Sequence, residues 1–85
     1  MKVGILGLGL IGGSLARAYT KQGHTVFAAD QNESILEFAQ LAGVVEAKLD
    51  STTIPQCDLI LLAIYAEGCK NWLLEYGSSL IKNHL

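Results

Sequence analysis

Apolar residues along this chain alternate between short continuous runs and longer runs with helical spacing. Residues 2–6 (KVGIL) are short, apolar and bounded by glycine, which is typical of a strand buried on both faces. From about Leu10, apolar side chains recur at helical intervals as far as Gly23, a residue type that commonly ends helices. Strand character returns over residues 24–29 (HTVFAA). The first third of the chain is therefore predicted to be strand, helix and strand.

The next segment repeats this alternation. A second helix is predicted over residues 33–41, where apolar side chains again recur at helical spacing. Either Asp30 or Asn32 can cap its start, and Gly43 closes it. The short apolar run 44–47 indicates a weak third strand.

The remaining residues predict a loop, a strand and a helix. Residues 50–56 (DSTTIPQ) are polar and contain the only proline, which favours a loop. Residues 59–64 (LILLAI) are the clearest buried strand, and residues 67–80 carry large apolar side chains at helical intervals. Strands that alternate with helices predict an α/β fold, a parallel sheet of about four strands with helices on both faces. Because such a fold continues with another strand, we expect residues 1–85 to be a truncated domain.

Composition and charge narrow the class of protein. The 85 residues are 51% hydrophobic and 16% charged, which excludes an intrinsically disordered chain. The net charge of −2 provides no positive surface for nucleic acid or for acidic lipid. A domain of this size buries only about 60% of its unfolded surface. We therefore expect some apolar surface to be covered by further chain, by a partner or by a second copy.

Membrane, secretory and metal-binding features are weak. No stretch reaches the ~20 apolar residues of a membrane-spanning helix. The uncharged stretch 3–16, with Ala-Arg-Ala at residues 16–18, resembles a secretory signal, but its five glycines and single preceding lysine argue against one. Cys57 and Cys69 form neither a disulfide framework nor a zinc pattern. We expect buried, inert thiols, no metal site and a cytoplasmic location.

The glycine-rich segment after the first strand carries the clearest functional signal. Gly7, Gly9 and Gly12 form a G-x-G-x-x-G pattern: the first permits a tight turn, the second admits a pyrophosphate close to the backbone, and the third allows close helix packing. Free amides at the start of the following helix stabilise an anion without a cationic side chain. The residues expected to contact a dinucleotide here are Gly7, Leu8, Gly9, Leu10, Ile11 and Gly12.

Asp30 ends the second predicted strand, 23 positions after Gly7. An aspartate at this place accepts hydrogen bonds from the adenosine ribose hydroxyls, and its charge repels a 2′-phosphate. Gln31 and Asn32 provide no arginine for such a phosphate. We therefore expect the cofactor to be NAD rather than NADP. The alternative is that Asp30 only caps the next helix and that the glycines only form turns.

A second group of candidate residues follows the fourth predicted strand. Ala63, Ile64 and Tyr65 lie at its carboxyl end, beside the first strand and across the topological switch point, so they are expected to border the dinucleotide. Tyr65 either contacts the cofactor or simply covers the sheet edge. Ser14 is expected to cap the first helix, contact phosphate or only pack. Turn, cap or boundary roles are expected for His24, Asp50 and Asp58.

Residues 7–15 (GLGLIGGSL) resemble the glycine loop of the prephenate and arogenate dehydrogenases of tyrosine biosynthesis. The likeness continues through Gly23-His24, Asp30, residues 42–44 (AGV) and residues 58–63 (DLILLA), and it covers most of the chain. The resemblance implies oxidative decarboxylation of a small-molecule substrate, prephenate or arogenate. In that reaction a hydride passes from the substrate ring to NAD while carbon dioxide leaves.

The sequence departs from that family at two places. Residues 63–65 are Ala-Ile-Tyr where many members have Ala-Val-Pro or Ala-Ile-Pro. This difference affects the expected geometry of the local loop and not the resemblance to the family. The family's catalytic histidine, its substrate-binding residues and its dimerisation domain have no counterpart in residues 1–85. The resemblance therefore implies the N-terminal, NAD-binding portion of a homo-oligomeric enzyme, inactive alone and without a catalytic residue of its own. The alternative is a stand-alone module that senses NAD or another adenine nucleotide without catalysis.

Overall fold

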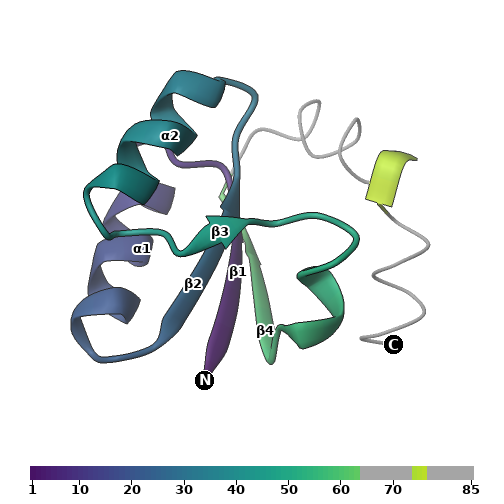
Figure 1. The fold of residues 1–85 in the computed structure, drawn as a ribbon, viewed down its shortest axis with the longest axis horizontal. Coiled ribbons are helices and arrows are strands. Elements are labelled where there is room, and N and C mark those ends of the chain that lie inside the picture. Colours follow the sequence, from purple (N-terminus) through teal and green to yellow (C-terminus); the bar gives the residue numbers. More distant parts are fainter. Residues whose placement is uncertain (64–73, 77–85) are drawn as a thin grey trace.

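The computed structural model of the chain describes residues 1–63 and 74–76. Four strands of these residues form one parallel sheet in the order β3-β2-β1-β4 (Figure 1). The elements are β1 (Lys2–Leu6), α1 (Leu10–Lys21), β2 (Thr25–Ala29), α2 (Glu33–Leu41), β3 (Ala47–Lys48), the 3₁₀ helix η1 (Ile54–Gln56) and β4 (Leu59–Leu62). This order places β4 beside β1, as predicted, and the α/β, Rossmann-type fold class is confirmed.

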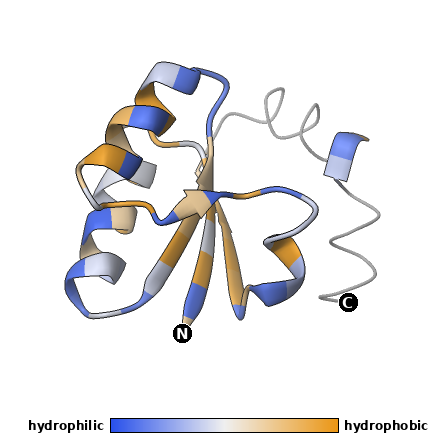
Figure 2. Ribbon diagram, in the orientation of Figure 1, coloured by the Kyte–Doolittle hydropathy of each residue, from blue (hydrophilic) through white to orange (hydrophobic). Residues whose placement is uncertain are grey.

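The sheet separates two hydrophobic cores. Helices α1 and α2 lie on one side of the strands, and the segment that contains η1 lies on the other (Figures 1 and 2). On one face, Ala16 of α1 and Leu36 of α2 pack in the same cluster as Ile5 of β1. On the other face, Ile54 of η1 packs with Phe27 of β2. In the part of the chain that the structure describes, both α-helices therefore cover one face, and the segment 49–57 covers the other. The helix predicted over residues 67–80 lies outside the described residues, apart from 74–76, which are helical.

Both helices end as their sequences predict. Gly23 and Gly43 follow α1 and α2 with φ angles of +90° and +75°, the left-handed conformation that glycine adopts without strain. Helix α2 starts after Asn32, whose side-chain oxygen accepts a hydrogen bond from the Ser34 amide at 3.0 Å. Of the two candidate caps, Asn32 is therefore the cap and Asp30 is not.

The third strand is displaced from its prediction. The run 44–47 was expected to be extended, whereas β3 is Ala47–Lys48. The amides of Val44 and Val45 both donate to the carbonyl of Ala39, so they belong to the exit from α2. Val45 is buried in the core beneath the helices, which explains an apolar run that is not a strand.

The loop and the fourth strand also differ in detail. The predicted loop 50–56 contains η1, and Asp50 shapes the turn before it by accepting the amides of Thr52 and Thr53. A hydrogen bond from the Thr52 hydroxyl at 2.7 Å, together with these two amides, holds the pKa of the Asp50 carboxyl below its usual value. Strand β4 ends at Leu62, so Ala63 is not part of it as predicted, and Ile64 lies outside the described residues. None of the helices in the described ranges has the length and apolar character needed to cross a membrane.

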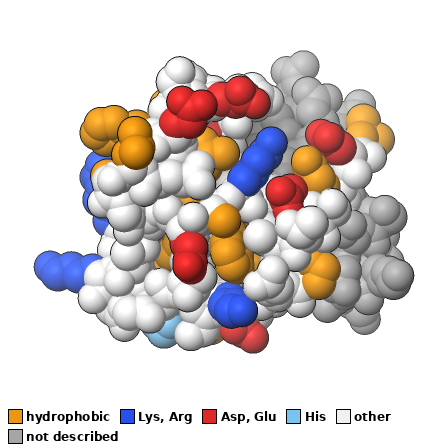
Figure 3. All heavy atoms as spheres, in the orientation of Figure 1, with side chains coloured by type: hydrophobic (Ala, Val, Ile, Leu, Met, Phe, Trp, Pro, Cys, Tyr) orange, Lys and Arg blue, Asp and Glu red, His pale blue; other side chains and the backbone are white. Residues whose placement is uncertain are grey.

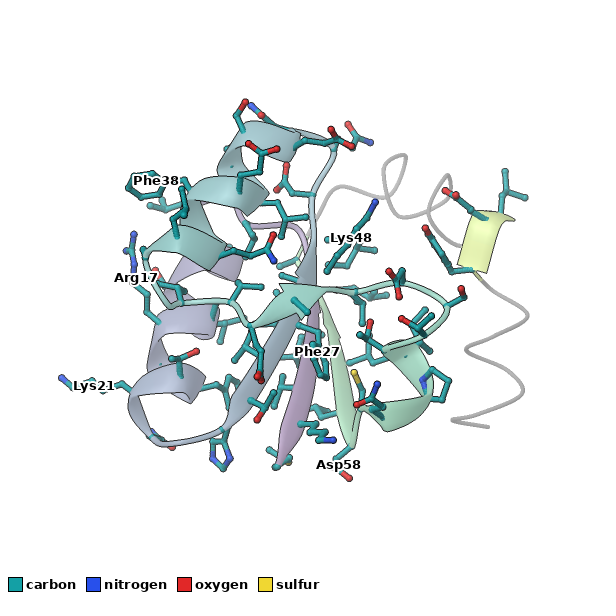
Figure 4. The ribbon with its side chains drawn as sticks, viewed as in Figure 1. Arg17, Lys21, Phe27, Phe38, Lys48 and Asp58 are labelled. Atoms are coloured by element: carbon teal, nitrogen blue, oxygen red, sulfur yellow. The ribbon has the colours of Figure 1, made fainter. Side chains whose placement is uncertain are left out.

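Helix α2 also presents apolar side chains outward. Ile35, Phe38 and Leu41 are spaced three residues apart, and the latter two are 71% and 89% exposed. Phe38 points away from the sheet (Figure 4), and hydrophobic side chains gather over this part of the surface (Figure 3). We call these three residues the outer stripe of α2. It is apolar surface that the described part of the chain does not bury.

Candidate cofactor-binding site

The glycine loop lies at the carboxyl edge of the sheet. Leu6, the last residue of β1, pairs with Ala29 of β2 and with Leu62 of β4, so the three strands end level with one another. The chain leaves β2 and β4 in the segments that begin with Asp30 and Ala63. Asp30, Ala63 and the glycine loop therefore lie at the same edge of the sheet. Beside β1 the strand order reverses, and such a switch point is where open α/β sheets bind ligands.

Gly7 makes the turn out of β1. Its φ angle is +96°, which disfavours any residue with a side chain. Its amide donates to the carbonyl of Ala29 at 2.7 Å, which ties the turn to the end of β2. The loop thus begins from a position fixed by the neighbouring strand.

Gly9 leaves one side of the loop open. It is the N-cap of α1 without a side-chain hydrogen bond, and its carbonyl accepts the first helical bond from Gly13 at 2.8 Å. The amides of residues 9–12 consequently have no acceptor within the helix. A Cβ atom built on Gly9 meets nothing within 4 Å, and the first turn of α1 contains no acidic residue. Free amides, open space and the positive end of a helix together suit the pyrophosphate of a dinucleotide.

Gly12 closes the other side. A Cβ built on it would lie 1.7 Å from the carbonyl oxygen of Gly7 and 3.2 Å from the Cβ of Ala63. Helix α1 therefore packs directly on the loop and next to the end of β4. The close packing expected of Gly12 is present, and its main contact is the loop carbonyl rather than the strand.

Two predicted contact residues expose apolar side chains at the start of α1. Leu10 is 91% exposed and Ile11 is 70% exposed. Ser14 donates its hydroxyl to the carbonyl of Leu10 at 2.9 Å, so it caps nothing and bonds within the helix. Of the three roles considered for Ser14, the structure excludes the cap.

Asp30 is held against the glycine loop. Its Oδ2 accepts a hydrogen bond from the amide of Leu8 at 2.7 Å, and its Oδ1 accepts the amide of Asn32 at 2.8 Å. A carboxylate oxygen has lone pairs for more than one donor, so both oxygens can still accept from ribose hydroxyls. The bond to Leu8 was not predicted. The bond to Asn32 does have a local signal, because an aspartate side chain commonly binds the backbone amide two residues on.

The other sequence candidates lie elsewhere. Asp58 accepts the amide of Lys2 at 2.8 Å, and His24 Nδ1 lies 3.1 Å from the amino group of Met1, both at the opposite edge of the sheet. Cys57 is buried, and burial, with Asp58 nearby, raises the pKa of its thiol to about 11. The predicted positions Ile64 and Tyr65 lie outside the described residues.

Comparison with known proteins gives concordant matches. A family model described as NADP oxidoreductase, coenzyme F420-dependent, matches residues 2–85. The arogenate dehydrogenase of Synechocystis superposes with a TM-score of 0.75 and 30% identity, over 86% of this chain and 27% of that one. The prephenate dehydrogenase of A. aeolicus, solved with hydroxyphenyl propionate and NAD⁺, gives a TM-score of 0.72 and 18% identity, over 92% and 29%.

A third match comes from a different enzyme. An imine reductase of Streptomyces aurantiacus gives a TM-score of 0.70 and 22% identity, over 88% of this chain and 26% of that one. The two matches of lower identity show a shared fold. In length, the chain spans between 26% and 29% of these three proteins.

Proposed function

We propose that this chain, which belongs to the family described as NADP oxidoreductase, coenzyme F420-dependent, is the NAD-binding part of a dehydrogenase that acts on prephenate or arogenate. The family and the fold make it an NAD(P)-binding oxidoreductase domain. The choice of NAD and of substrate is our proposal. When bound, the nicotinamide of NAD supplies the hydride acceptor, and the residues of this chain bind and orient the other half of the cofactor.

The open side of the glycine loop carries the proposal. The space beside Gly9 is clear to 4 Å, and the amides of residues 9–12, which have no acceptor within the helix, stand at the start of α1. A pyrophosphate bound there accepts those amides, while Gly12 keeps the helix close enough for them to reach. The exposed side chains of Leu10 and Ile11 flank this position, and Ala63 adjoins it. We also assign Ile64 and Tyr65 to the border of the site, as the sequence predicts.

The charges around Asp30 favour NAD over NADP. The residues that follow are Gln31, Asn32 and Glu33, so the start of α2 carries a carboxylate and no cation. The side chain of Asn32 is already occupied in capping that helix. A ribose 2′-phosphate beside Asp30 would meet its negative charge, and Gln31 and Asn32 supply no arginine to compensate for it.

The substrate assignment rests on the relatives. The glycine loop 7–15 resembles that of prephenate and arogenate dehydrogenases, and an arogenate dehydrogenase is 30% identical over most of this chain. We assign the substrate-binding and catalytic residues to a longer protein that contains this chain, and we expect that protein to be a cytoplasmic homo-oligomer. It takes a small molecule and no nucleic acid.

Calorimetric titration of the chain with NAD and with NADP tests the cofactor. NAD is expected to bind more tightly, and equal or tighter binding of NADP would overturn the choice. Gly9→Ala is expected to weaken NAD binding tenfold or more while leaving the fold intact, because its methyl group enters only the open space. Gly13→Ala is the matched control, since that residue faces the carbonyl of Leu8 rather than the open side.

The substrate is tested separately on the longer protein. With NAD present, formation of NADH is followed by absorbance after addition of prephenate or arogenate. Turnover of either compound supports the substrate assignment. If neither compound is turned over, the assignment is contradicted. If Gly9→Ala loses NAD affinity but neither substrate is turned over, the cofactor site is correct and only the substrate assignment is wrong. If Gly9→Ala keeps its NAD affinity, the cofactor site itself is wrong.

A further inference from the structure

We propose that Asp30 is a positioning residue of the glycine loop in addition to accepting the adenosine ribose, so that one carboxylate couples the two halves of the cofactor site. The inference rests on the proposed function, because it concerns the same site. It assigns to Asp30 an effect on ligands that have no ribose hydroxyl at all.

The loop needs an external support. Leu8 is flanked by Gly7 and Gly9, residues whose backbone conformations are the least restricted. Two consecutive amides of this loop are tied to two consecutive residues at the end of β2. Gly7 donates to the carbonyl of Ala29, and Leu8 donates to the Asp30 carboxylate, both at 2.7 Å. Leu8 as a whole is only 8% exposed, so its burial also helps to hold the peptide that precedes Gly9.

Asp30 is itself held in place. Its second oxygen accepts the amide of Asn32, and the Asn32 side chain in turn accepts the amide of Ser34 in the first turn of α2. A chain of hydrogen bonds therefore runs from the start of α2 through Asp30 to the glycine loop. Each Asp30 oxygen spends one lone pair on this chain and retains one for a ribose hydroxyl. Recognition of the ribose and support of the loop are thus compatible in the same side chain.

Replacement of Asp30 by asparagine separates the effect of its hydrogen bonds on the loop from the effect of its charge on the ligand. Both backbone partners of Asp30 are N–H donors, whereas an asparagine side chain has one acceptor and one donor group. Asp30→Asn therefore loses at least one of the two bonds and places an NH₂ group against an N–H. Removal of a negative charge would by itself strengthen binding of a diphosphate. Weaker diphosphate binding in this variant consequently reports lost positioning and not lost charge.

The probes are ADP and 2′,3′-dideoxy-ADP, which carry the same diphosphate with and without ribose hydroxyls. Asp30→Asn is expected to weaken the binding of dideoxy-ADP by about tenfold, which is the usual effect of losing a hydrogen bond to a charged group. Asp58→Asn is the matched control, because Asp58 also accepts one backbone amide but lies at the opposite edge of the sheet. It is expected to bind both probes as the unaltered chain does. Unchanged dideoxy-ADP affinity in Asp30→Asn would overturn the proposal.

Hydrogen exchange of the unaltered protein gives a second test that does not depend on a variant folding. The Leu8 amide is expected to exchange slowly, while the neighbouring Gly9 amide, which has no helical acceptor, exchanges fast. Equally fast exchange at both amides would overturn the positioning role. Failure of the unaltered chain to bind ADP contradicts the proposed function, whereas the exchange of the Leu8 amide reports on the support of the loop without any ligand.

Discussion

A methyl group at position 12 would occupy space that the glycine loop already fills. The Cβ of an alanine at Gly12 would lie 1.7 Å from the carbonyl oxygen of Gly7 and 2.8 Å from its carbonyl carbon. Both are backbone atoms, so no flexible side chain can move aside. Real Cβ contacts are essentially never shorter than 3.0 Å. Gly12→Ala must therefore push the loop and α1 apart by roughly 1 Å or more, a distortion comparable to overpacking a core.

The energetic cost is isolated by comparison with the adjacent residue. Overpacking costs about 1–3 kcal/mol, and replacing glycine by alanine within a helix returns about 0.5–1 kcal/mol. Gly13→Ala gains the stabilisation from alanine in a helix without the cost of overpacking. Its Cβ would lie 3.4 Å from the Leu8 carbonyl oxygen, which is close to ordinary contact. The free energy of unfolding of Gly12→Ala should therefore be lower than that of Gly13→Ala by about 1–3 kcal/mol. For a domain of this size the difference corresponds to roughly 4–8 °C in Tm per kcal/mol.

Urea unfolding followed by circular dichroism measures this difference, and titration with NAD measures its effect on the site. Gly13→Ala should be at least as stable as the unaltered chain and bind NAD normally. Gly12→Ala should be the less stable variant and bind NAD weakly, because a displaced Gly7 carbonyl moves the amides of residues 9–12. Equal stability of the two variants would refute the close packing of α1 on the loop.

Two further predictions concern the thiol and the assembly of the chain. In a Cys69→Ser variant, Cys57 should react with an alkylating reagent at pH 8 about a hundredfold more slowly when folded than in urea, because a rise of its pKa from 9.0 to about 11 lowers the thiolate fraction by that factor. Equal rates would show that the thiol is accessible. Light scattering at micromolar concentration should reveal association, since β4 pairs only with β1 among the described residues and the outer stripe of α2 is exposed. A monodisperse mass of 9.1 kDa would contradict this expectation.

Local chemistry explains which elements could be predicted from the sequence. Glycine after a helix and glycine after a strand act through their own backbone, so Gly23 and Gly7 were identified from sequence. The cap of α2 was narrowed to Asp30 or Asn32, and the structure decides for Asn32. The run 44–47 failed as a strand because tertiary packing decides whether Val45 belongs to a strand or to the exit from α2. Polarity identified residues 50–56 as a loop and concealed the role of Ile54 within it, which is to cover one face of the sheet.

The candidate site was predicted in part for the same reason. Spacing alone placed Asp30 near the glycine loop, because parallel strands end at the same edge. The bond from the Leu8 amide to Asp30 joins residues 22 positions apart, and no local pattern specifies which amide faces the carboxylate. The cofactor roles of Ile64 and Tyr65 stay predictions, since both lie outside the described residues.

The central position of β1 has a consequence for how the chain folds as it is synthesised. One edge of β1 pairs with β2, in a register that brings Lys2 beside Thr25, and this partner leaves the ribosome early. The other edge pairs with β4, in a register that brings Val3 beside Leu59. This edge therefore stays unpaired until the residues up to β4 have been synthesised. Throughout that interval the nascent protein carries an open, apolar strand edge, which is a template for incorrect pairing. Docking of β4 is therefore the step that covers this strand edge and removes the template.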